Sequence, residues 1–459
     1  MDNTKKIYLF EEAPVTKALI TLSVPTVISS LVMILYNLAD TYFVSMLADP
    51  IQNAAVTLAA PVLLAFNAVN NLFGVGSSSL MSRALGKKDY EMVKRSSAFG
   101  FYLSLLCGLL FSLLFFTLRS PMLRLLGTDA QNTAATAEYL KWTVGFGAAP
   151  AILNVVMAYL VRSEGESLHA SIGTMSGCLL NIVLDPIFIL PFGFNMGAAG
   201  AGLATFISNC AACLYFFVLL AVKKNKTYVC INPGKFRPSR AITLGVFAVG
   251  VPAAIQNLLN VTGMTVLNNF TAEFGSDAVA AMGIAQKINM IPLYVALGTS
   301  QGIMPLVGYN YANGNIKRMK KAVVLSEEIT LLLMALMTGM FFAFPGFFVG
   351  LFMKNEIILG YGSAFLRGMC LCLPFLSTDF LAVGVFQACG MGKKSLVFAT
   401  LRKIVLEIPA LFILNYFFPL YGLCYAQTVA EIILAAAAVV VTVKMFSRLE
   451  KQNAVVKED

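Results

Sequence analysis

The sequence contains very little histidine, tryptophan or charge for its length. Of its 459 residues, one is histidine (His169), one is tryptophan (Trp142), and 12% are charged. A single histidine excludes most histidine-rich metal sites and leaves only His169 for any histidine-based triad, for which the sequence shows no nucleophile constellation. The 9 cysteines lie mostly within apolar runs, where they are typical packing residues and show no ligand spacing. We therefore expect no enzyme and no cofactor.

Apolar residues, in contrast, dominate the composition. They make up 58% of the chain, and the mean hydropathy is +0.78. A soluble chain of this length would carry about twice the charged fraction, so the composition is typical of a membrane protein. The net charge of +10 could indicate nucleic-acid binding, but the basic residues follow the predicted membrane topology. We therefore expect membrane lipids, and no nucleic acid, as partners.

Long apolar runs recur along the whole chain. Because about 20 apolar residues span a bilayer as a helix, we predict an all-α membrane protein with about twelve transmembrane helices. The predicted spans are 18–46, 52–81, 94–117, 137–161, 169–191, 197–222, 242–273, 277–308, 320–350, 358–386, 396–418 and 421–446.

Lysine and arginine are unevenly distributed between the two sides of these spans. Most fall on one side, in the segments 83–95, 223–240, 317–321 and 393–403 and in the two termini. The loops of the other side have only Arg119, Arg124 and Lys354. By the positive-inside rule we expect a multi-pass protein of the bacterial cell (inner) membrane with both termini in the cytoplasm.

The two halves of the chain resemble each other. Pro25 has a counterpart in Pro252, and the segment 86–94 has one in 312–320. Residues 182–185 match 404–407, and 200–205 match 422–427, at an offset that stays at about 220 to 227 residues. We predict two pseudo-symmetric six-helix lobes, 1–222 and 242–459, joined by a polar cytoplasmic linker at 223–241.

One apolar segment, residues 171–190, contains an acid, an amide and a proline. Burying a carboxylate in hydrocarbon costs several kcal/mol, so an intramembrane aspartate such as Asp185 indicates a functional site. Asn181 lies one helical turn before Asp185, where its amide oxygen and the carboxylate can share one ion or proton. The alternative is that Asp185 only caps a helix broken at Pro186.

Two further polar residues lie at a similar predicted depth. The rise per residue places Asp185 and Thr205 at one level in the outer half of the membrane, with Asp40 at or above it. Neighbouring carboxylates cannot both stay charged without a cation, so either one is protonated or Na⁺ lies between them. Such a charge switch can decide whether the first helix, weakened at Pro25, is straight or bent. Thr205 could instead only join packed helices, and Asp40 could be solvated at the interface.

Helical spacing places more polar groups near this level. Ala201, Thr205 and Asn209 follow one another at four-residue intervals, and Tyr36 precedes Asp40 by four residues. Both helices can therefore contribute to one cavity.

The second half carries the acids Asp379, Glu407 and Glu431, with Gln256 shortly after Pro252. Glu407 takes the place of Asp185 in the repeat. Because Arg402 and Lys403 precede Glu407, a structural salt bridge and a transport role are both open for this glutamate.

Several motifs of the chain resemble those of the multidrug and toxic compound extrusion (MATE) family, and of its MepA-like bacterial branch in particular. They are residues 10–15, 74–76 with 82–86, 162–165, 181–188 and Glu431. The resemblance covers essentially the whole chain, and 181–188 is its most specific piece. It implies a two-lobed, twelve-helix exporter. In this family, organic cations and amphipathic drugs move out against an inward flux of Na⁺ or H⁺ by alternating access.

The resemblance also implies functional residues, carried over position by position. The N-lobe cation site, which would hold Na⁺ or a proton, falls on Asp40, Asn181, Asp185 and Thr205, with the Ala201 carbonyl as a further ligand. Polar positions of the substrate cavity fall on Tyr36 and Asn209, and we expect Asp379 and Gln256 of the second lobe to line this cavity as well. In the second lobe, the acid of sodium-coupled relatives corresponds to Asp379, and the region of Gln256 replaces their glutamate.

We therefore expect a secondary active exporter of drug-like organic cations that acts as a monomer by Na⁺ or H⁺ antiport. The alternative is an exporter or flippase of a lipid-linked or sugar metabolite on a related fold. Such proteins tend to use cationic cavities for phosphate groups, whereas the midspan segments offer few basic residues, Lys287 being the main one. This difference favours cationic cargo.

Overall fold

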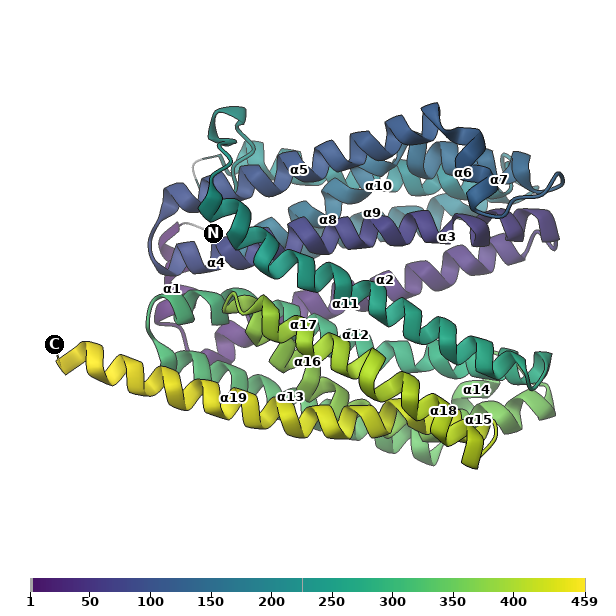
Figure 1. Ribbon diagram of the computed structural model, residues 1–459. Helices are drawn as coiled ribbons and strands as arrows, with labels where there is room; N and C mark the ends of the chain where they lie inside the picture. Colours follow the sequence, from purple (N-terminus) through teal and green to yellow (C-terminus); the bar gives the residue numbers. More distant parts are fainter. Residues whose placement is uncertain (1–2, 225, 459) are drawn as a thin grey trace. The chain divides into compact units, whose positions relative to one another are not determined.

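The computed structural model describes residues 3–224 and 226–458 (Figure 1). It is almost entirely helical, and no strand occurs within these residues. The chain divides into two compact units. Unit 1 consists of Met1–Glu12 and Ile28–Ala254, and unit 2 of Ala13–Val27 and Ile255–Asp459. The lobe limits expected from the sequence, 1–222 and 242–459, stay a prediction.

Unit 1 contains the helices from α1 to the first half of α11. They are α1 (Asn3–Glu11), α2 (Val15–Ser45) from residue 28 on, α3 (Pro50–Asn70), the π-helix η1 (Asn71–Val75), α4 (Gly76–Gly86), α5 (Tyr90–Thr117), α6 (Arg119–Leu125), α7 (Thr133–Leu140), the π-helix η2 (Lys141–Phe146), α8 (Ala148–Ser163), α9 (Ser167–Ile189), α10 (Ala198–Val222), the short 3₁₀ helix η3 (Pro233–Lys235) and α11 (Arg240–Ala272) up to residue 254. Within this unit α9 packs along α10, and α5 along α8.

Unit 2 contains the start of α2 and the helices from the second half of α11 onward. They are α12 (Ser276–Ala312), α13 (Ile316–Ala343), α14 (Pro345–Gly350), α15 (Glu356–Cys370), α16 (Leu373–Ala388), α17 (Gly392–Thr400), the π-helix η4 (Leu401–Glu407), α18 (Ile408–Phe417), the 3₁₀ helix η5 (Tyr421–Tyr425) and α19 (Ala426–Glu458). Here α12 packs against both α15 and α16, and α16 against α19.

The division between the units falls inside two helices at matching places. It cuts α2 between residues 27 and 28 and α11 between 254 and 255. In each helix the last residue before the division lies two positions after a proline of the predicted repeat, Pro25 or Pro252. Since proline has no backbone N–H to donate, each helix is weakest close to the point where it passes from one unit to the other.

Matching helix caps support the internal repeat. The Asp89 side chain caps α5 by accepting the backbone N–H of Met92 over 2.9 Å. The Asn315 side chain caps α13 by accepting the backbone N–H of Arg318 over 3.1 Å. Asp89 and Asn315 occupy the same position in the repeated segments 86–94 and 312–320. The repeat therefore places equivalent start signals on equivalent helices.

Two glycines of α12 allow the first part of α2 to approach closely. A Cβ atom at Gly302 would lie 2.6 Å from the Cα of Ser23, and one at Gly298 would lie 2.8 Å from the Cα of Val27. Both pairs are spaced by four residues, so they form one continuous contact line. Small residues at this spacing are typical of packed membrane helices.

A buried ion-pair cluster attaches α1 to the linker after α10. The Nζ atom of Lys6 lies 2.9 Å from Glu164 Oε1 and 3.5 Å from Glu166 Oε1. Glu164 also accepts the backbone N–H of Tyr228 over 2.6 Å. Burial alone would raise the pKa of Glu166, but Lys6 and Lys223 outweigh burial and hold this pKa below its usual value.

The helices agree with the predicted membrane spans. Nine helices among the described residues are long and apolar enough to cross a membrane, or eleven if each of two bent pairs is one span. All of them coincide with predicted spans. The remaining predicted span, 396–418, is the segment of α17, η4 and α18, which is less apolar because it carries Arg402, Lys403 and Glu407. The predicted all-α membrane fold is confirmed.

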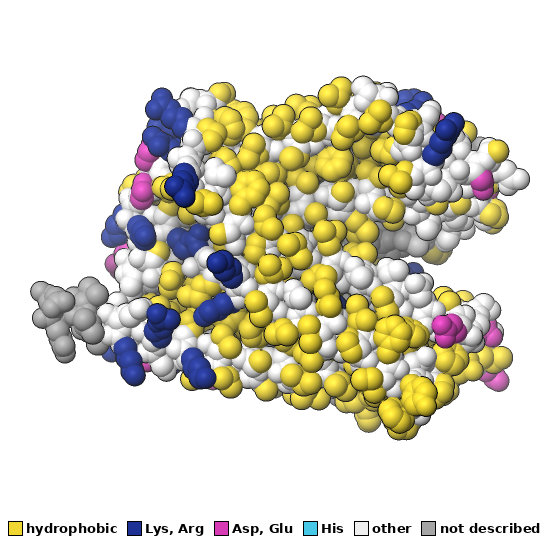
Figure 2. Space-filling model, in the orientation of Figure 1, with side chains coloured by type: hydrophobic (Ala, Val, Ile, Leu, Met, Phe, Trp, Pro, Cys, Tyr) yellow, Lys and Arg dark blue, Asp and Glu magenta, His cyan; other side chains and the backbone are white. Residues whose placement is uncertain are grey.

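The surface of the helices fits a bilayer. Figure 2 shows apolar side chains over the long flanks of both units, with most lysine and arginine side chains at one end and a few at the opposite end of unit 1. Exposed apolar side chains include Leu113 on α5, which is 58% exposed, and Leu332 on α13, which is 71% exposed. In water such a surface would be unfavourable, whereas lipid tails can cover it.

Candidate functional site

The centre of the unit 1 site is the contact between α9 and α10. Asn181 and Asp185 lie one turn apart on α9 and are 2% and 0% exposed. We assign the amide of Asn181 so that its NH₂ group faces the carboxylate, because the reverse orientation would set two acceptors against each other. Asn181 Nδ2 then donates to Asp185 Oδ2 over 2.9 Å, and Asn181 Oδ1 accepts the backbone N–H of Thr205 over 3.0 Å.

Asp40 on α2 belongs to the same site. The carboxylates of Asp40 and Asp185 are near enough to interact electrostatically. Tyr36, one turn before Asp40, interacts with both Asp40 and Thr205. Asp40 Oδ1 is buried and receives no hydrogen bond from any residue that the structure describes. Two acids of separate helices thus share one polar site, in which an acceptor atom is open to a cation or a proton.

Tyr139 of α7 is a member of this site that sequence reasoning missed. It is 4% exposed, and its hydroxyl interacts electrostatically with both Asp40 and Asp185. No polar spacing along α7 marks this residue, because only the packing of α7 beside α10 brings the phenol to the acids. A tyrosine hydroxyl can both donate to a carboxylate and accept from a protonated one.

The other predicted residues of unit 1 lie around this centre. Ala201 is fully buried on α10, one turn before Thr205. Asn209, one turn after Thr205, accepts a hydrogen bond from the side chain of Asn154 on α8 over 2.9 Å. The side-chain oxygen of Asn209 is thus already hydrogen-bonded to a residue of α8.

Unit 2 contains a second charged cluster. Arg402 Nη1 lies 3.1 Å from Asp379 Oδ2, and the two residues are 2% and 1% exposed. Arg402 also donates to Asn260 over 3.0 Å, and its guanidinium lies 4.6 Å from the ring centre of Phe380. Lys403, the next residue, pairs with Glu407 one turn further along, with 2.6 Å between Nζ and Oε2. The salt bridge of Glu407, which the sequence left open, is formed.

This cluster corrects one expectation. Arg402 and Lys403 were counted with the cytoplasmic loops, but both are buried inside the helix η4. Lys287, the basic residue expected in the midspan region, lies within α12 and has an exposed side chain. The error arose because a charged pair at the start of a span resembles a flanking loop, and only tertiary packing reveals the acids that neutralise it.

The cluster lines a cavity of about 140 Å³. Lys403, Glu407 and Glu431 contribute charged groups to it, and Asn289 contributes a polar one. Gln256 lies outside the cavity and accepts a hydrogen bond from Gln387 over 3.2 Å. Of the two residues predicted for a second-lobe cavity, Asp379 therefore lies behind Arg402, and Gln256 belongs to a separate hydrogen-bond network.

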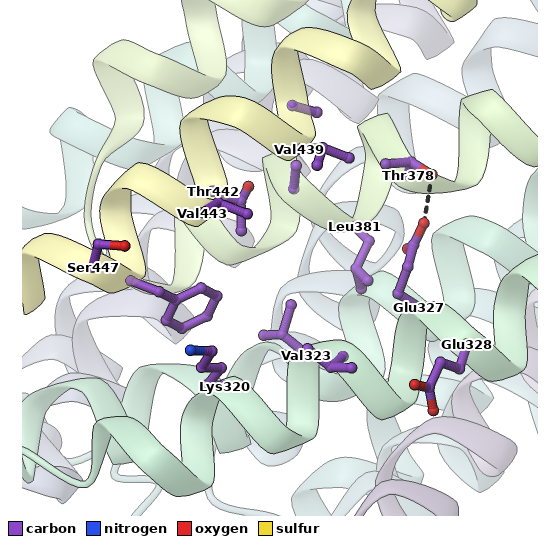
Figure 3. A pocket seen from close by; sticks show the side chains of 14 residues that line it. Lys320, Val323, Glu327, Glu328, Thr378, Leu381, Val439, Thr442, Val443 and Ser447 are labelled. Carbon is purple, nitrogen blue, oxygen red and sulfur yellow. Dashed lines mark hydrogen bonds between the residues drawn. The ribbon is translucent and has the colours of Figure 1, made fainter. Parts of the chain in front are cut away.

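Figure 3 shows another cavity of unit 2, an apolar groove of about 260 Å³ between α13, α16 and α19. Val323, Leu381 and Val439 line its apolar part. The hydroxyl of Thr378 donates to the carboxylate of Glu327 at its side. No residue predicted from the sequence lines this groove.

An all-helical membrane fold with buried acids inside its helical units is typical of membrane transporters. The family model MatE matches residues 25–187 and 252–413, so both halves of the chain carry the family pattern. The protein belongs to the MatE family, the multidrug and toxic compound extrusion transporters.

Individual relatives agree with this assignment. The chain is 33% identical to the multidrug export protein MepA of Staphylococcus aureus (strain MRSA252), over 97% of both chains. A crystal structure of MATE in the straight conformation matches it with a TM-score of 0.90 and 28% identity, over 97% of this chain and 99% of that one. A crystal structure of MATE in the bent conformation matches with a TM-score of 0.89 and 28% identity, over 98% and 99%.

Proposed function

We propose that this protein exports cationic and amphipathic compounds across a bacterial cell membrane by antiport of Na⁺ or H⁺, with both termini in the cytoplasm. The observation that carries the proposal is the shared site of Asp40 and Asp185. A buried acid pair has a strong preference for one compensating positive charge. Occupation by a proton or Na⁺ is therefore coupled to the state of the helices that hold the two acids.

The coupling acts through α2. This helix carries Asp40 and Tyr36 in unit 1 and Pro25 at its weak point, while its first part belongs to unit 2. A proton or Na⁺ at Asp40 removes repulsion from Asp185, which favours one geometry of α2, and release of the ion favours another. Relatives occur in straight and bent conformations, which supports a role of helix bending in transport by this chain.

The residues of the site have distinct roles in this proposal. Asp185 and Asp40 hold the coupling ion, and Thr205 and the Ala201 carbonyl are further ligands if that ion is Na⁺. Asn181 orients the Asp185 carboxylate by donating to it. Tyr36 and Asn209 contribute polar surface for substrate, and the transporter works as a monomer that contacts membrane lipids.

The second candidate function, export or flipping of a lipid-linked or sugar metabolite, is favoured by the buried Arg402 and Lys403. Phosphate groups require an excess of positive charge. In unit 2, however, Asp379 and Glu407 already neutralise these two bases. The cluster therefore supports cationic cargo better than anionic cargo.

Efflux of a fluorescent cationic dye from vesicles tests the proposal, with a Na⁺ gradient and a pH gradient imposed separately. Wild type should export the dye under one of the two gradients, and the effective gradient identifies the coupling ion. Asp185→Asn should abolish this efflux. Asp277→Asn is the matched control, because Asp277 is an exposed acid in the first turn of α12. If folded wild type exports dye in neither gradient, drug export is the wrong function.

A further inference from the structure

The linker between α10 and α11 is hydrogen-bonded to α5 at successive residues. The Ser97 hydroxyl accepts the backbone N–H of Cys230 over 3.0 Å and donates to the carbonyl oxygen of the same residue over 3.2 Å. The Tyr102 hydroxyl donates to the carbonyl oxygen of Ile231 over 2.7 Å. A backbone segment attached in this way can serve as the wall of a binding site, because a ligand does not have to order it first.

The same linker forms one wall of an open pocket of about 810 Å³ in unit 1. The linker lies at the end of this unit where lysine and arginine side chains gather (Figure 2). Three lysines from different elements line the pocket, namely Lys94 of α5, Lys224 after α10 and Lys235 of η3. The described residues that line it include no aspartate or glutamate. A pocket of this size can hold the polar head of an organic ligand.

Two of these lysines differ from the third in their charge balance. The Nζ atom of Lys235 lies 2.9 Å from Glu91 Oε2, so an acid outside the pocket neutralises it. Lys94 and Lys224 form no ion pair with any residue in 3–224 or 226–458. The pocket therefore carries two uncompensated positive charges. A phosphate group matches them, because each lysine ammonium group can donate to one of its oxygens.

An apolar surface continues from the pocket along α10. Leu220, in the last turn of this helix, lines the pocket and is 8% exposed. Phe217 lies one turn earlier on the same face and is 36% exposed. Its ring centre is 6.2 Å from that of Phe101 on α5, so the two helices are neighbours here. A soluble anion would leave this apolar surface uncovered, whereas a phospholipid brings a phosphate group and an acyl chain together.

We propose that this pocket binds the headgroup of an anionic phospholipid. The phosphate oxygens accept hydrogen bonds from Lys94 and Lys224, and an acyl chain lies along Leu220 and Phe217. The site is separate from the acids of both units, and its occupation does not depend on the cargo. Phosphatidylcholine and phosphatidylethanolamine fit less well, because their ammonium groups cancel the phosphate charge and meet the lysines with charge of the same sign.

Native mass spectrometry of the full-length protein in detergent tests this site, because it resolves individual bound lipids. The probes are dihexanoyl phosphatidylglycerol and dihexanoyl phosphatidylcholine, which share acyl chains and phosphate but differ in net charge. Glycerophosphoglycerol, the headgroup without acyl chains, represents a soluble phosphate ligand. The test variant combines Lys94→Gln with Lys224→Gln. The matched control combines Lys317→Gln with Lys321→Gln, which removes the same charge from two exposed lysines of α13 in unit 2.

We expect wild type to bind phosphatidylglycerol at least roughly tenfold more tightly than phosphatidylcholine or glycerophosphoglycerol. This comparison needs no variant, so it tests the site even if a substitution impairs folding. The variant of Lys94 and Lys224 should bind phosphatidylglycerol at least roughly tenfold more weakly than wild type, because both free ammonium groups are gone. The control variant of Lys317 and Lys321 should bind it as wild type does.

Equal affinity for the two lipids would overturn the proposal, as would an equal loss of binding in the test and control variants. Equal affinity for phosphatidylglycerol and glycerophosphoglycerol would overturn it too, because the pocket would then select a soluble phosphate. The outcome is independent of the dye-efflux experiment. Absent efflux with selective lipid binding counts against the exporter function alone. Intact efflux without selective lipid binding counts against the lysine pocket alone.

Discussion

Asp379 on α16 and Arg402 on η4 form a buried ion pair, with 3.1 Å between Oδ2 and Nη1, although 23 residues separate them in the sequence. Asn260 of α11 and the ring of Phe380 complete the surroundings of the guanidinium. Arg402 therefore supplies a positive charge to a carboxylate that is buried inside unit 2.

This ion pair predicts an asymmetric response to mutation. Asp379→Asn removes the carboxylate that is hydrogen-bonded to the buried Arg402 and should lower the free energy of unfolding by about 3–5 kcal/mol. The double substitution Asp379→Leu with Arg402→Met should cost much less, because both charges are gone. Thermal unfolding in detergent measures both. A double variant no more stable than Asp379→Asn would contradict the prediction.

Tyr139 should matter for transport without being needed for folding. Tyr139→Phe removes only the hydroxyl, which interacts electrostatically with Asp40 and Asp185. We expect coupled dye efflux to fall by roughly tenfold, the loss expected if this hydroxyl donates to one of the two acids during transport. Tyr416→Phe is the matched control, because Tyr416 is 82% exposed. Unchanged efflux in Tyr139→Phe would remove this tyrosine from the site.

The cluster of Lys6, Glu164 and Glu166 should make stability depend on acid pH. The pKa of Glu166 is held below its usual value of 4.5 in the folded protein. The unfolded chain therefore binds the proton more tightly, so this stabilisation is present above pH 4.5 and is lost as the pH falls through the lower, folded pKa. Thermal unfolding across this acid range should show a shallower pH slope for Glu166→Gln than for wild type. Parallel slopes would exclude the contribution.

Two glycines of α12 offer a matched test of close packing. Gly302→Ala places a Cβ atom 2.6 Å from the Cα of Ser23, so the helices must separate and the protein should lose stability. At Gly283 nothing lies within 4 Å of the added Cβ. Gly283→Ala should therefore stabilise the helix by about 0.5–1 kcal/mol. Melting temperatures that shift in the same direction for both variants would contradict the packing argument.

Much of the unit 1 site can be predicted from the sequence because its signals are local. Asp185 and Asn181 stand one turn apart in an apolar segment, and the helical repeat alone puts them on one face. Asp40 and Thr205 also stand out, since polar residues are rare in such segments. Tyr139 could not be found in this way. A tyrosine near the start of a predicted span has many ordinary roles, and its interaction with both acids depends on how α7 packs.

The sequence by itself determined that the chain is helical, that it crosses the membrane many times, and that its halves repeat. Apolar runs of sufficient length can satisfy their backbone groups in lipid only as helices, and the repeated prolines and caps lie in the chain itself. Only the tertiary structure decided the partners of the buried charges. Arg402 and Lys403 look like loop residues until Asp379 and Glu407 are seen beside them. Glu431 looks ordinary until its carboxylate is found buried, without a hydrogen bond from any residue that the structure describes. Electrostatic interaction depends on distance in space, and the sequence fixes that distance only through the packing of the helices.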